Sequence, residues 1–380
     1  MSTDVPSLAQ ALSLIPDFRQ PQGRRYELLP VLLLSCVAVM CGCRSESAIA
    51  DWGKNYGSTW LRKLGFKHGR GPSQPTLHRI FKGINHLLLE SALRDWAQAV
   101  LSLWPSISSQ KLEGISIDGK TLRGSCKQGA ADTHLLSCMS QTLGIVISQV
   151  GVEDETNEIT KVEQLLEGLV LEGKVVTADA LLTQRSIAES VIKSGGDYLF
   201  VVKANQPQLL EEIEMSFADY WWLRDTISEG SLTDQHGNRI HQWELKASTL
   251  LEGYSNWPGL RQVLKMERRV FNKRSGEQRW ETSYAITSMG PEKASPDELI
   301  KLWREHWHIE NRLHWVRDVT YDEDRSQVRV GHIGEVMAAF RNAAISVMRL
   351  KGARNIASEC RRYAAQPSLA LAAVGIDPGE

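Results

Sequence analysis

The hydrophobic positions in the first hundred residues follow a helical period. Residues 28–40 form one apolar run, and residues 45–52 continue it or begin another helix. A break at residues 72–75 precedes a further helix, which Thr76 can cap and which carries Leu77, Ile80 and Phe81 on one side. We therefore expect residues 1–105 to form a helical domain, and the basic outer positions of the last helix suit a helix-turn-helix-like DNA reader or a plain amphipathic helix.

The pattern changes to short strands after residue 112. Residues 112–118 alternate as a strand that Gly119 ends, and residues 135–140 and 145–152 pair as a hairpin. Thr160 and Glu163 form a capping-box pattern for a helix to about residue 169, and residues 184–193 form another helix. Strands at residues 174–178 and 198–202 complete the order of three strands, helix, strand, helix, strand. This order predicts an α/β core.

Residues 207–295 interrupt that core. A helix at residues 209–215 is followed by strand-like stretches at residues 242–247, 262–271 and 280–287, so we expect a β-rich insertion. Ser295, Pro296 and Glu298 then begin a helix that we expect to continue to about Arg317. Helices at residues 331–350 and 355–363 follow, and the chain from Gln366 is expected to be loose. We predict three parts: a helical, DNA-binding domain (1–105), a core domain (106–325) and a helical tail (326–380).

Composition changes this picture little, but charge is unevenly distributed. The chain has 380 residues, 42% of them hydrophobic, and a net charge of −1, which argues against a protein held on nucleic acid by bulk charge alone. Residues 60–82 nevertheless contain six basic residues and no acidic one, and residues 325–363 contain eight basic residues against two acidic ones. Such segregation is typical of DNA-binding patches or of solvated helix faces, and the sequence alone leaves both open.

The cysteines and the apolar run at residues 30–43 indicate a cytoplasmic protein. The six cysteines contain no CxxC pair and no zinc spacing, so a reduced protein is the simple interpretation. The apolar run is shorter than the roughly 20 residues that span a bilayer, which favours a buried helix. We expect no membrane contact.

Two aspartates stand at the ends of apolar strands, where their carboxylates are held rigidly. Asp118 follows Ser116-Ile117, and Asp179 follows Thr177-Ala178. A single aspartate in this position more often only caps the turn after its strand. Two on adjacent strands, with a third carboxylate from a helix, can hold Mg²⁺ or Mn²⁺, because hard divalent cations prefer oxygen ligands.

Long motifs in this sequence closely resemble the H-repeat-associated family of insertion-sequence transposases. They are Ser116-Ile117-Asp118-Gly119-Lys120, Thr177-Ala178-Asp179-Ala180, Gly196-Asp197-Tyr198 with Lys203-Ala204-Asn205-Gln206, His306-Trp307-His308-Ile309-Glu310-Asn311 with Leu313-His314-Trp315, and Asp17-Phe18-Arg19 with Gly23-Arg24-Arg25. The resemblance covers nearly the whole chain.

The resemblance implies a DDE transposase with a ribonuclease H-like mixed sheet, flanking helices and a β-rich insertion. Asp118, Asp179 and Glu310 are then the acidic triad that binds two Mg²⁺ ions, or Mn²⁺ in their place, for phosphoryl transfer. The expected substrate is double-stranded DNA, as element ends and target, held by a homodimer. The bacterial cytoplasm and its nucleoid are the expected location.

Residues outside the triad are expected to contact DNA. Aligning the family's Tyr-Arg-Glu-Lys signature on Glu310 places Trp303, His306 and Arg317 at the other three positions, so this sequence departs from the signature everywhere but at the acid. The family's His-Gly-Arg segment is one residue out of step here, at His236-Gly237-Asn238-Arg239. The full set of expected DNA contacts is Arg62, Lys63, Lys67, Arg70, Arg79, Lys82, Lys120, Lys203, His306 and Arg317.

Helix geometry favours Glu310 as the third carboxylate over its acidic neighbours. In a continuous α-helix, His306, Glu310 and Arg317 share one face, whereas Asp318 is rotated by about 80° from Glu310. Glu323 and Asp324 lie in a polar stretch that we expect to be mobile. Core packing is the expected role of Trp307 and Trp315, and the HxxxE spacing of His306 and Glu310 lacks a third nitrogen or sulfur ligand for zinc.

Two other functions remain open at this point. A nuclease of the same fold would cut DNA without joining it, and a transposase-derived protein without activity would only bind DNA. Detection of strand transfer separates the first from a transposase, and a metal-dependent nicking assay on element ends separates the second.

Overall fold

A computed structural model describes residues 5–104, 112–122, 133–152, 158–218, 226–326, 328 and 330–378. The chain forms two compact units, each built from segments distant in sequence. The first unit contains residues 1–110, 119–161 and 309–380, and the second contains residues 111–118 and 162–308. The sequence instead predicts three consecutive parts, and that division stays a prediction.

The N-terminal part of the first unit is helical, as predicted. Its elements are α1 (Leu8–Ser13), the 3-10 helix η1 (Pro21–Gly23), α2 (Leu28–Met40), α3 (Glu46–Asn55), α4 (Gly57–Lys63), α5 (Gln74–Gly83) and α6 (His86–Leu103). The prediction for α2 is confirmed at both ends, and Leu32, Leu34 and Val37 in it are fully buried. An α-helix that is apolar on all sides is stable in water only when other elements surround it, and α1, α3, α12, α13 and α14 all pack against α2.

The start of α5 differs from the prediction. The helix begins at Gln74 after Ser73, with Pro75 in its first turn, so residues 72–75 are not a complete break and Thr76 is not the cap. Thr76 Oγ1 instead lies 3.2 Å from Ser73 Oγ. Proline is tolerated in the first helical turn because the amide hydrogen it lacks would have no partner there.

The strand order is β3-β2-β1-β4-β5-β9-β8-β7-β6, and β1 contributes residues to both units. The core strands are β1 (Glu113–Leu122), β2 (Thr133–Ser140), β3 (Val146–Val152), β4 (Lys174–Ala178) and β5 (Asp197–Val202). Strand β4 pairs in parallel with β1 and β5, and β2 and β3 form the predicted antiparallel hairpin. This is the ribonuclease H-like order that the sequence predicted.

Two local predictions in the core are wrong. Gly119 does not end the first strand, because β1 continues to Leu122. The helix α8 spans Glu158–Leu166, so Thr160 lies inside it and does not cap it. By contrast, β4 has the predicted ends, and α9 (Arg185–Lys193) begins after Gln184 and ends before Ser194. Between them lies the 3-10 helix η2 (Ala180–Leu182).

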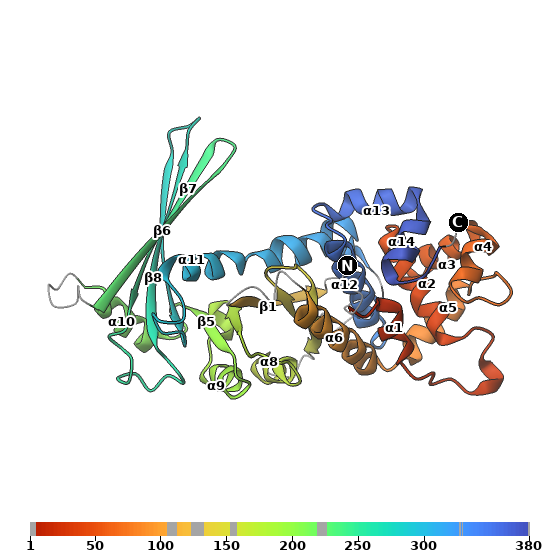
Figure 1. The fold of residues 1–380 in the computed structure, drawn as a ribbon, viewed down its shortest axis with the longest axis horizontal. Coiled ribbons are helices and arrows are strands. Elements are labelled where there is room, and N and C mark those ends of the chain that lie inside the picture. The colour runs from red at the N-terminus through yellow and green to blue at the C-terminus, as the bar shows by residue number, and fades with distance from the viewer. Residues whose placement is uncertain are drawn as a thin grey trace. The chain divides into compact units, whose positions relative to one another are not determined.

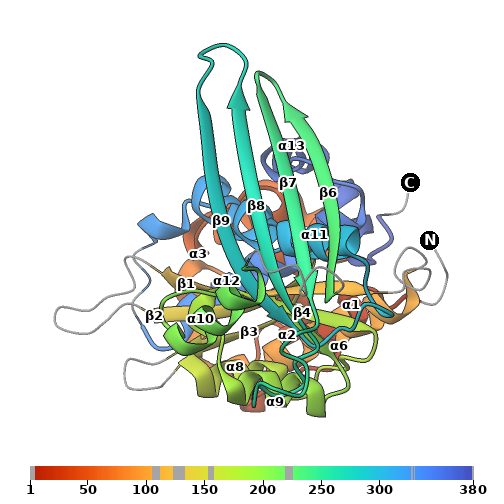
Figure 2. The same cartoon turned by 90° about the vertical axis from the view of Figure 1, so that its left-hand side faces the viewer.

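The β-rich insertion extends the core sheet. After α10 (Pro207–Ser216), four long strands follow: β6 (Ile227–His236), β7 (Arg239–Ser248), β8 (Gln262–Asn272) and β9 (Gln278–Thr287). Strand β9 pairs antiparallel with β5, and the four strands run side by side as one ribbon (Figure 2). Strand β6 was not predicted from the sequence, and its side chains are mostly exposed.

The helix α11 (Pro296–Glu305) packs against β6 and β7 within the second unit (Figure 1). Its predicted start is confirmed, since Ser295 and Glu298 form a capping box with Pro296 in the first turn. Leu299, Ile300 and Trp303 are buried with side chains from β7 and β8. The predicted continuous α-helix to Arg317 is wrong, because α11 ends at Glu305 and two π-helical segments follow, η4 (Glu310–His314) and η5 (Val316–Thr320).

The C-terminal part of the first unit contains three helices. After the 3-10 helix η6 (Glu323–Arg325), α12 (Ile333–Leu350) and α13 (Ile356–Ala365) match the predicted tail. The expectation of a loose end from Gln366 is wrong, because α14 (Pro367–Val374) buries Ala370, Leu371 and Val374.

Two expectations from composition can be compared with the structure. Among the helices in the described part of the chain, none is long and apolar enough to cross a membrane. The five cysteines that the structure describes all carry free thiols.

Candidate active site

Asp118 and Asp179 occupy equivalent positions on neighbouring strands of the second unit. The last pair in the β1–β4 register is Ile117 with Ala178. Asp118 is the next residue of β1, and Asp179 directly follows β4 with an extended backbone. Parallel strands in register direct equivalent side chains to the same face of a sheet. The two carboxylates that the sequence predicted as partners therefore share one face of the sheet.

Asp179 lies at the point where the chain leaves the sheet. It follows the last residue of β4 and caps η2, and its Oδ1 accepts a 2.7 Å hydrogen bond from the amide of Ala180. Lys203 Nζ lies 3.2 Å from the same oxygen, and the two side chains are 63% and 54% exposed. The cap fixes the backbone while the carboxylate stays open to solvent, as a metal ligand requires.

Two side chains in the loop after β5 donate hydrogen bonds to the backbone of the loop that follows Asp179. Asn205 Nδ2 donates a 2.7 Å hydrogen bond to the carbonyl of Ala180, and Gln206 Nε2 donates a 3.0 Å bond to the carbonyl of Thr183. Sequence reasoning assigned no role to Asn205. The only signal was a run of polar residues directly after a buried strand, which does not by itself reveal a partner in another loop.

His306 lies against the same face of the sheet as the two aspartates. Its Nδ1 is 3.0 Å from Thr177 Oγ1, which also donates a 3.4 Å hydrogen bond to Ser116 Oγ. Ser116 and Thr177 each stand two residues before an aspartate, so they lie on its face. His306 therefore anchors the end of α11 to the strands that carry Asp118 and Asp179.

Glu310 belongs to the first unit and lies in the π-helical segment η4. Its side chain is 49% exposed, and its Oε2 is 3.2 Å from Nδ1 of His314, a buried side chain that sequence reasoning did not select. In a π-helix the hydrogen bonds span five residues, so a rotation of 100° per residue does not apply. The predicted common face of His306, Glu310 and Arg317 therefore has no basis, although π-helical turns are frequent at functional sites.

Comparisons with known proteins identify the family of this chain. The family described as "Transposase DDE domain" matches residues 109–346, and the family "DDE_Tnp_1-associated" matches residues 9–97. The chain belongs to the DDE transposase family. Its relatives in Escherichia coli (strain K12) include "H repeat-associated putative transposase YhhI" and "Putative protein YbfL", each 30% identical and each aligned over 91% of both chains.

One solved structure also resembles this family member. It is a cryo-EM structure of the piggyBac transposase synaptic complex with hairpin DNA, with a TM-score of 0.39 and 11% sequence identity over 97% of this chain and 77% of that chain. We draw nothing from a similarity at this level.

Arg317 is not placed to contact DNA, although it aligns with the basic position of the DDE family's helix signature. Its side chain is fully buried, and its Nε donates a 2.7 Å hydrogen bond to Oε2 of Glu323. Arg341 Nη1 donates a 2.6 Å bond to the other carboxylate oxygen. Glu323 is therefore held between two arginines in the core of the first unit, and the expectation of a mobile Glu323 is wrong.

Lys120 is also paired with acidic groups within its unit. Its Nζ lies 2.5 Å from Asp318 and 3.4 Å from Asp324, and its side chain is 8% exposed. Burial raises the pKa of Asp318, and the hydrogen bond from Lys120 counteracts that shift only in part. This position gives no support to the predicted DNA contact of Lys120, because its charge is already neutralised by two carboxylates.

The tryptophans near Glu310 differ from one another in exposure. Trp303 is buried in the core of the second unit, whereas Trp307 and Trp315 are 64% and 53% exposed. The prediction that Trp307 and Trp315 pack in the core is therefore wrong.

The predicted basic stretch of the N-terminal helices is largely exposed. Arg62, Lys67, Arg70, Arg79 and Lys82 are exposed and Lys63 is half-buried. Lys67 forms a 2.7 Å ion pair with Glu27. Arg70 and Lys54 line a cavity of about 630 Å³ between α3, α4 and the start of α5.

Two other basic residues lie beside buried carboxylates. His78, expected on an outer position of α5, lies 3.0 Å from the buried carboxylate of Glu46. Arg341, counted among the basic residues of the C-terminal stretch, is buried beside Glu323. The segment His236-Gly237-Asn238-Arg239 forms the tip of the β6–β7 hairpin, where Gly237 has φ 56°. Glycine suits this turn because a positive φ is unstrained for it.

Proposed function

We propose that this protein is a transposase that cuts the ends of an insertion sequence and joins them to target DNA, with Asp118, Asp179 and Glu310 as its acidic triad. The observation that carries the proposal is the register of β1 and β4, which brings two aspartates to one sheet face in a chain of the DDE transposase family. Glu310 is the proposed third member because the long motif that contains it resembles the family motif that carries the third acid.

Carboxylate oxygens are the ligands that a hard divalent cation prefers. Asp179 and Glu310 offer oxygen atoms on side chains that are 54% and 49% exposed, and oxygen ligands favour Mg²⁺ or Mn²⁺ over softer metals. Two such ions, when bound, supply charge stabilisation and lower the pKa of the attacking hydroxyl or water. Lys203 is a proposed phosphate contact beside the metal ligands, because its Nζ lies 3.2 Å from Asp179 Oδ1.

The proposed reaction consists of two in-line displacements at phosphorus. In cleavage, a water oxygen forms the new P–O bond and the 3′ oxygen of the element end leaves. In joining, that 3′ hydroxyl attacks a phosphodiester of the target and displaces its 3′ oxygen. Because two ends must be joined together, we expect a homodimer in the synaptic complex.

Mutation of the third carboxylate tests the catalytic assignment. Glu310→Gln keeps the size of the side chain but removes its charge, so it should abolish metal-dependent nicking of DNA that carries the element ends. Asp318→Asn is the matched control, since Asp318 lies in the same π-helical region but is bound to Lys120. Normal cutting by Glu310→Gln together with an inactive Asp318→Asn would show that the third carboxylate is wrongly assigned. Cutting that persists in EDTA would exclude a metal-dependent reaction.

The strand-transfer step needs its own assay. Pre-cut element ends with free 3′ hydroxyls should be joined to a supercoiled target in the presence of Mg²⁺ or Mn²⁺. Cutting without joining would identify a nuclease of the same family, and binding without either would identify a DNA-binding protein.

The basic residues of α4 and of the loop after it are the proposed DNA contacts of the first unit. Each phosphate contact releases counterions, so the triple variant Arg62→Ala, Lys63→Ala, Arg70→Ala should bind DNA more weakly and with a flatter salt dependence, by about one unit of slope per lost contact. Lys193→Ala is the control, because Lys193 is 79% exposed and lies in the second unit. An unchanged salt slope in the triple variant would show that these side chains are only solvated.

A further inference from the structure

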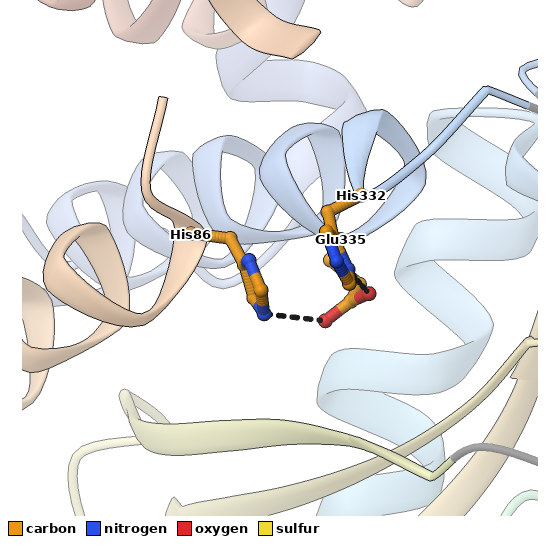
Figure 3. Close-up of side chains that lie close together, drawn as sticks. All are labelled: His86, His332 and Glu335. Atoms are coloured by element: carbon orange, nitrogen blue, oxygen red, sulfur yellow. Dashed lines mark hydrogen bonds and ion pairs between the residues drawn. The ribbon is translucent and has the colours of Figure 1, made fainter. Parts of the chain in front are cut away.

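Two histidines and a glutamate lie together in the first unit, on helices that are far apart in the sequence. His86 is the first residue of α6, His332 directly precedes α12, and Glu335 lies in the first turn of α12. Figure 3 shows His86 and His332 facing the Glu335 carboxylate from two different helices. His332 Nδ1 is 2.7 Å from Glu335 Oε1, and His86 Nε2 is 3.7 Å from Glu335 Oε2.

We propose that His86, His332 and Glu335 form a second metal site, which binds a divalent transition-metal ion such as Zn²⁺. One ligand atom from each residue lies within 4.8 Å of the others. Two imidazoles and one carboxylate are a ligand set that favours zinc, and they differ from the all-carboxylate set proposed for catalysis. A water molecule would complete a tetrahedral site, because the His332 side chain is 52% exposed.

The spacing of the ligand atoms requires only a small adjustment for such an ion. Zinc–ligand bonds of about 2.0–2.2 Å in a tetrahedron place the ligand atoms roughly 3.3 Å apart. The 3.7 Å separation of His86 and Glu335 is close to that value, and the 2.7 Å separation of His332 and Glu335 must lengthen. The two imidazole rings stack with centroids 3.8 Å apart and planes at 18°, so one ring must turn to direct its lone pair at the ion.

The residues around Glu335 support a specific role for its carboxylate. A Cβ atom at Gly151 of β3 would lie 2.8 Å from Glu335 Oε2, so a larger residue there would shift the carboxylate from this position. Gln149 Nε2 donates a 3.2 Å hydrogen bond to the backbone carbonyl oxygen of Glu335. Asn342 in turn donates a 2.6 Å bond to Gln149 Oε1. Groups around the ligands that fix their orientation are typical of metal sites in proteins.

The ion would join α6 to α12 across the first unit. The carboxylate and one imidazole come from α12 and the second imidazole comes from α6, so binding should stabilise the contact between these helices. Such a tether acts on the folded state, because the unfolded chain does not bring the three ligands together.

Metal titration of the full chain tests this site. Co²⁺ replaces Zn²⁺ as a visible probe, and the measurement is made with Mg²⁺ in excess and with Asp118→Asn and Asp179→Asn present to weaken the carboxylate site. We expect one equivalent of Co²⁺ to give the absorption of a tetrahedral nitrogen–oxygen site, and Zn²⁺ to displace it. His86→Gln and His332→Gln should each remove this absorption.

Two further variants separate a metal site from a simple ion pair. Gly151→Ala changes no ligand, yet it should weaken Co²⁺ binding by about 10- to 100-fold by displacing the carboxylate. His78→Gln is the control, since His78 also lies 3.0 Å from a glutamate but belongs to no group of three ligating residues in the part of the chain that the structure describes. It should leave Co²⁺ binding unchanged.

Chemical modification gives a readout that needs no variant. Zn²⁺, but not Mg²⁺, should protect His86 and His332 of the unmodified chain from diethyl pyrocarbonate, as mapped by mass spectrometry. Absence of saturable Co²⁺ binding, binding that survives both histidine variants, or equal modification with and without Zn²⁺ would each overturn the proposal.

Discussion

Asp179 and Glu323 are both carboxylates that contact basic side chains, but they differ in solvent exposure and in the number of their basic partners. Asp179 meets one lysine at 3.2 Å and is 54% exposed. Glu323 is 2% exposed and lies between Arg317 at 2.7 Å and Arg341 at 2.6 Å. The first carboxylate has unused ligand capacity and access to solvent, whereas the second has all its charge compensated in the core. A carboxylate of the first kind is suited to chemistry, and one of the second kind is suited to holding the fold.

The largest expected effect is on activity and concerns the exposed carboxylate. Asp179→Asn should reduce DNA cleavage by on the order of 1,000-fold or more, because a neutral side chain holds a divalent cation poorly. Glu229→Gln is the matched control, since Glu229 is also an exposed acid 3.2 Å from a lysine, Lys246. Cleavage is measured on DNA with the element ends, and melting temperatures are measured alongside. Equal cleavage activity of the two variants would show that Asp179 has no special role in cleavage.

The next effect is on stability and concerns the buried carboxylate. Glu323→Gln leaves Arg317 and Arg341 buried without a counter-charge, so the free energy of unfolding should fall by about 3–5 kcal/mol. Urea unfolding measures this value, with Asp179→Asn as the variant that should change it by less than about 1 kcal/mol. A stable Glu323→Gln protein would mean that the buried cluster does not hold the first unit together.

Glu323 should also make the free energy of unfolding depend on pH. Burial alone would raise the pKa of this carboxyl, but the charges of Arg317 and Arg341 outweigh burial and lower it to about 2. A lowered pKa in the folded state stabilises the protein above the unfolded value of 4.5, and that contribution is lost as the pH falls from 4.5 towards 2.

Glu90 is a half-buried residue whose carboxyl behaves in the opposite way. Burial raises its pKa from 4.5 to about 8, and the hydrogen bond from Gln149 counteracts this only in part. The folded state therefore keeps a proton that the unfolded chain releases, so stability should decline as the pH rises from about 4.5 to 8. Glu90→Gln should remove this decline and gain roughly 1–3 kcal/mol at pH 8 relative to the unchanged chain. Parallel pH profiles of the two proteins would contradict the assignment.

The smallest effect concerns the partner of Asp179. Lys203→Met removes an exposed ion pair and should change the free energy of unfolding by about 0–1 kcal/mol. Arg341→Met, the corresponding change in the buried cluster, should cost several times more because it leaves Glu323 with one partner. Urea unfolding of both variants under one buffer condition measures the ratio, and similar losses would show that exposure does not separate the two ion pairs.

Where the sequence signal was local, it predicted the structure closely. Ser295, Pro296 and Glu298 determine the start of α11 through contacts within four residues. Apolar runs with clear ends likewise defined α2 and β4. The missed elements had no such signal: β6 is exposed along most of its length, and α14 is short and is stabilised by burial of its apolar side chains.

The acidic residues of the candidate site, and the strands that lead to two of them, could be predicted from the sequence. Asp118 and Asp179 follow apolar stretches whose β-structure is encoded locally, and their chain order is that of the DDE family. Which of the neighbouring charges are exposed could not be predicted, because it depends on how distant segments pack. Arg317 and Glu323 look like surface residues in the sequence, but Arg341 from a later helix completes their pairing and lets all three be buried. Burial of a charge depends on partners that are distant in the chain, and no local pattern records them.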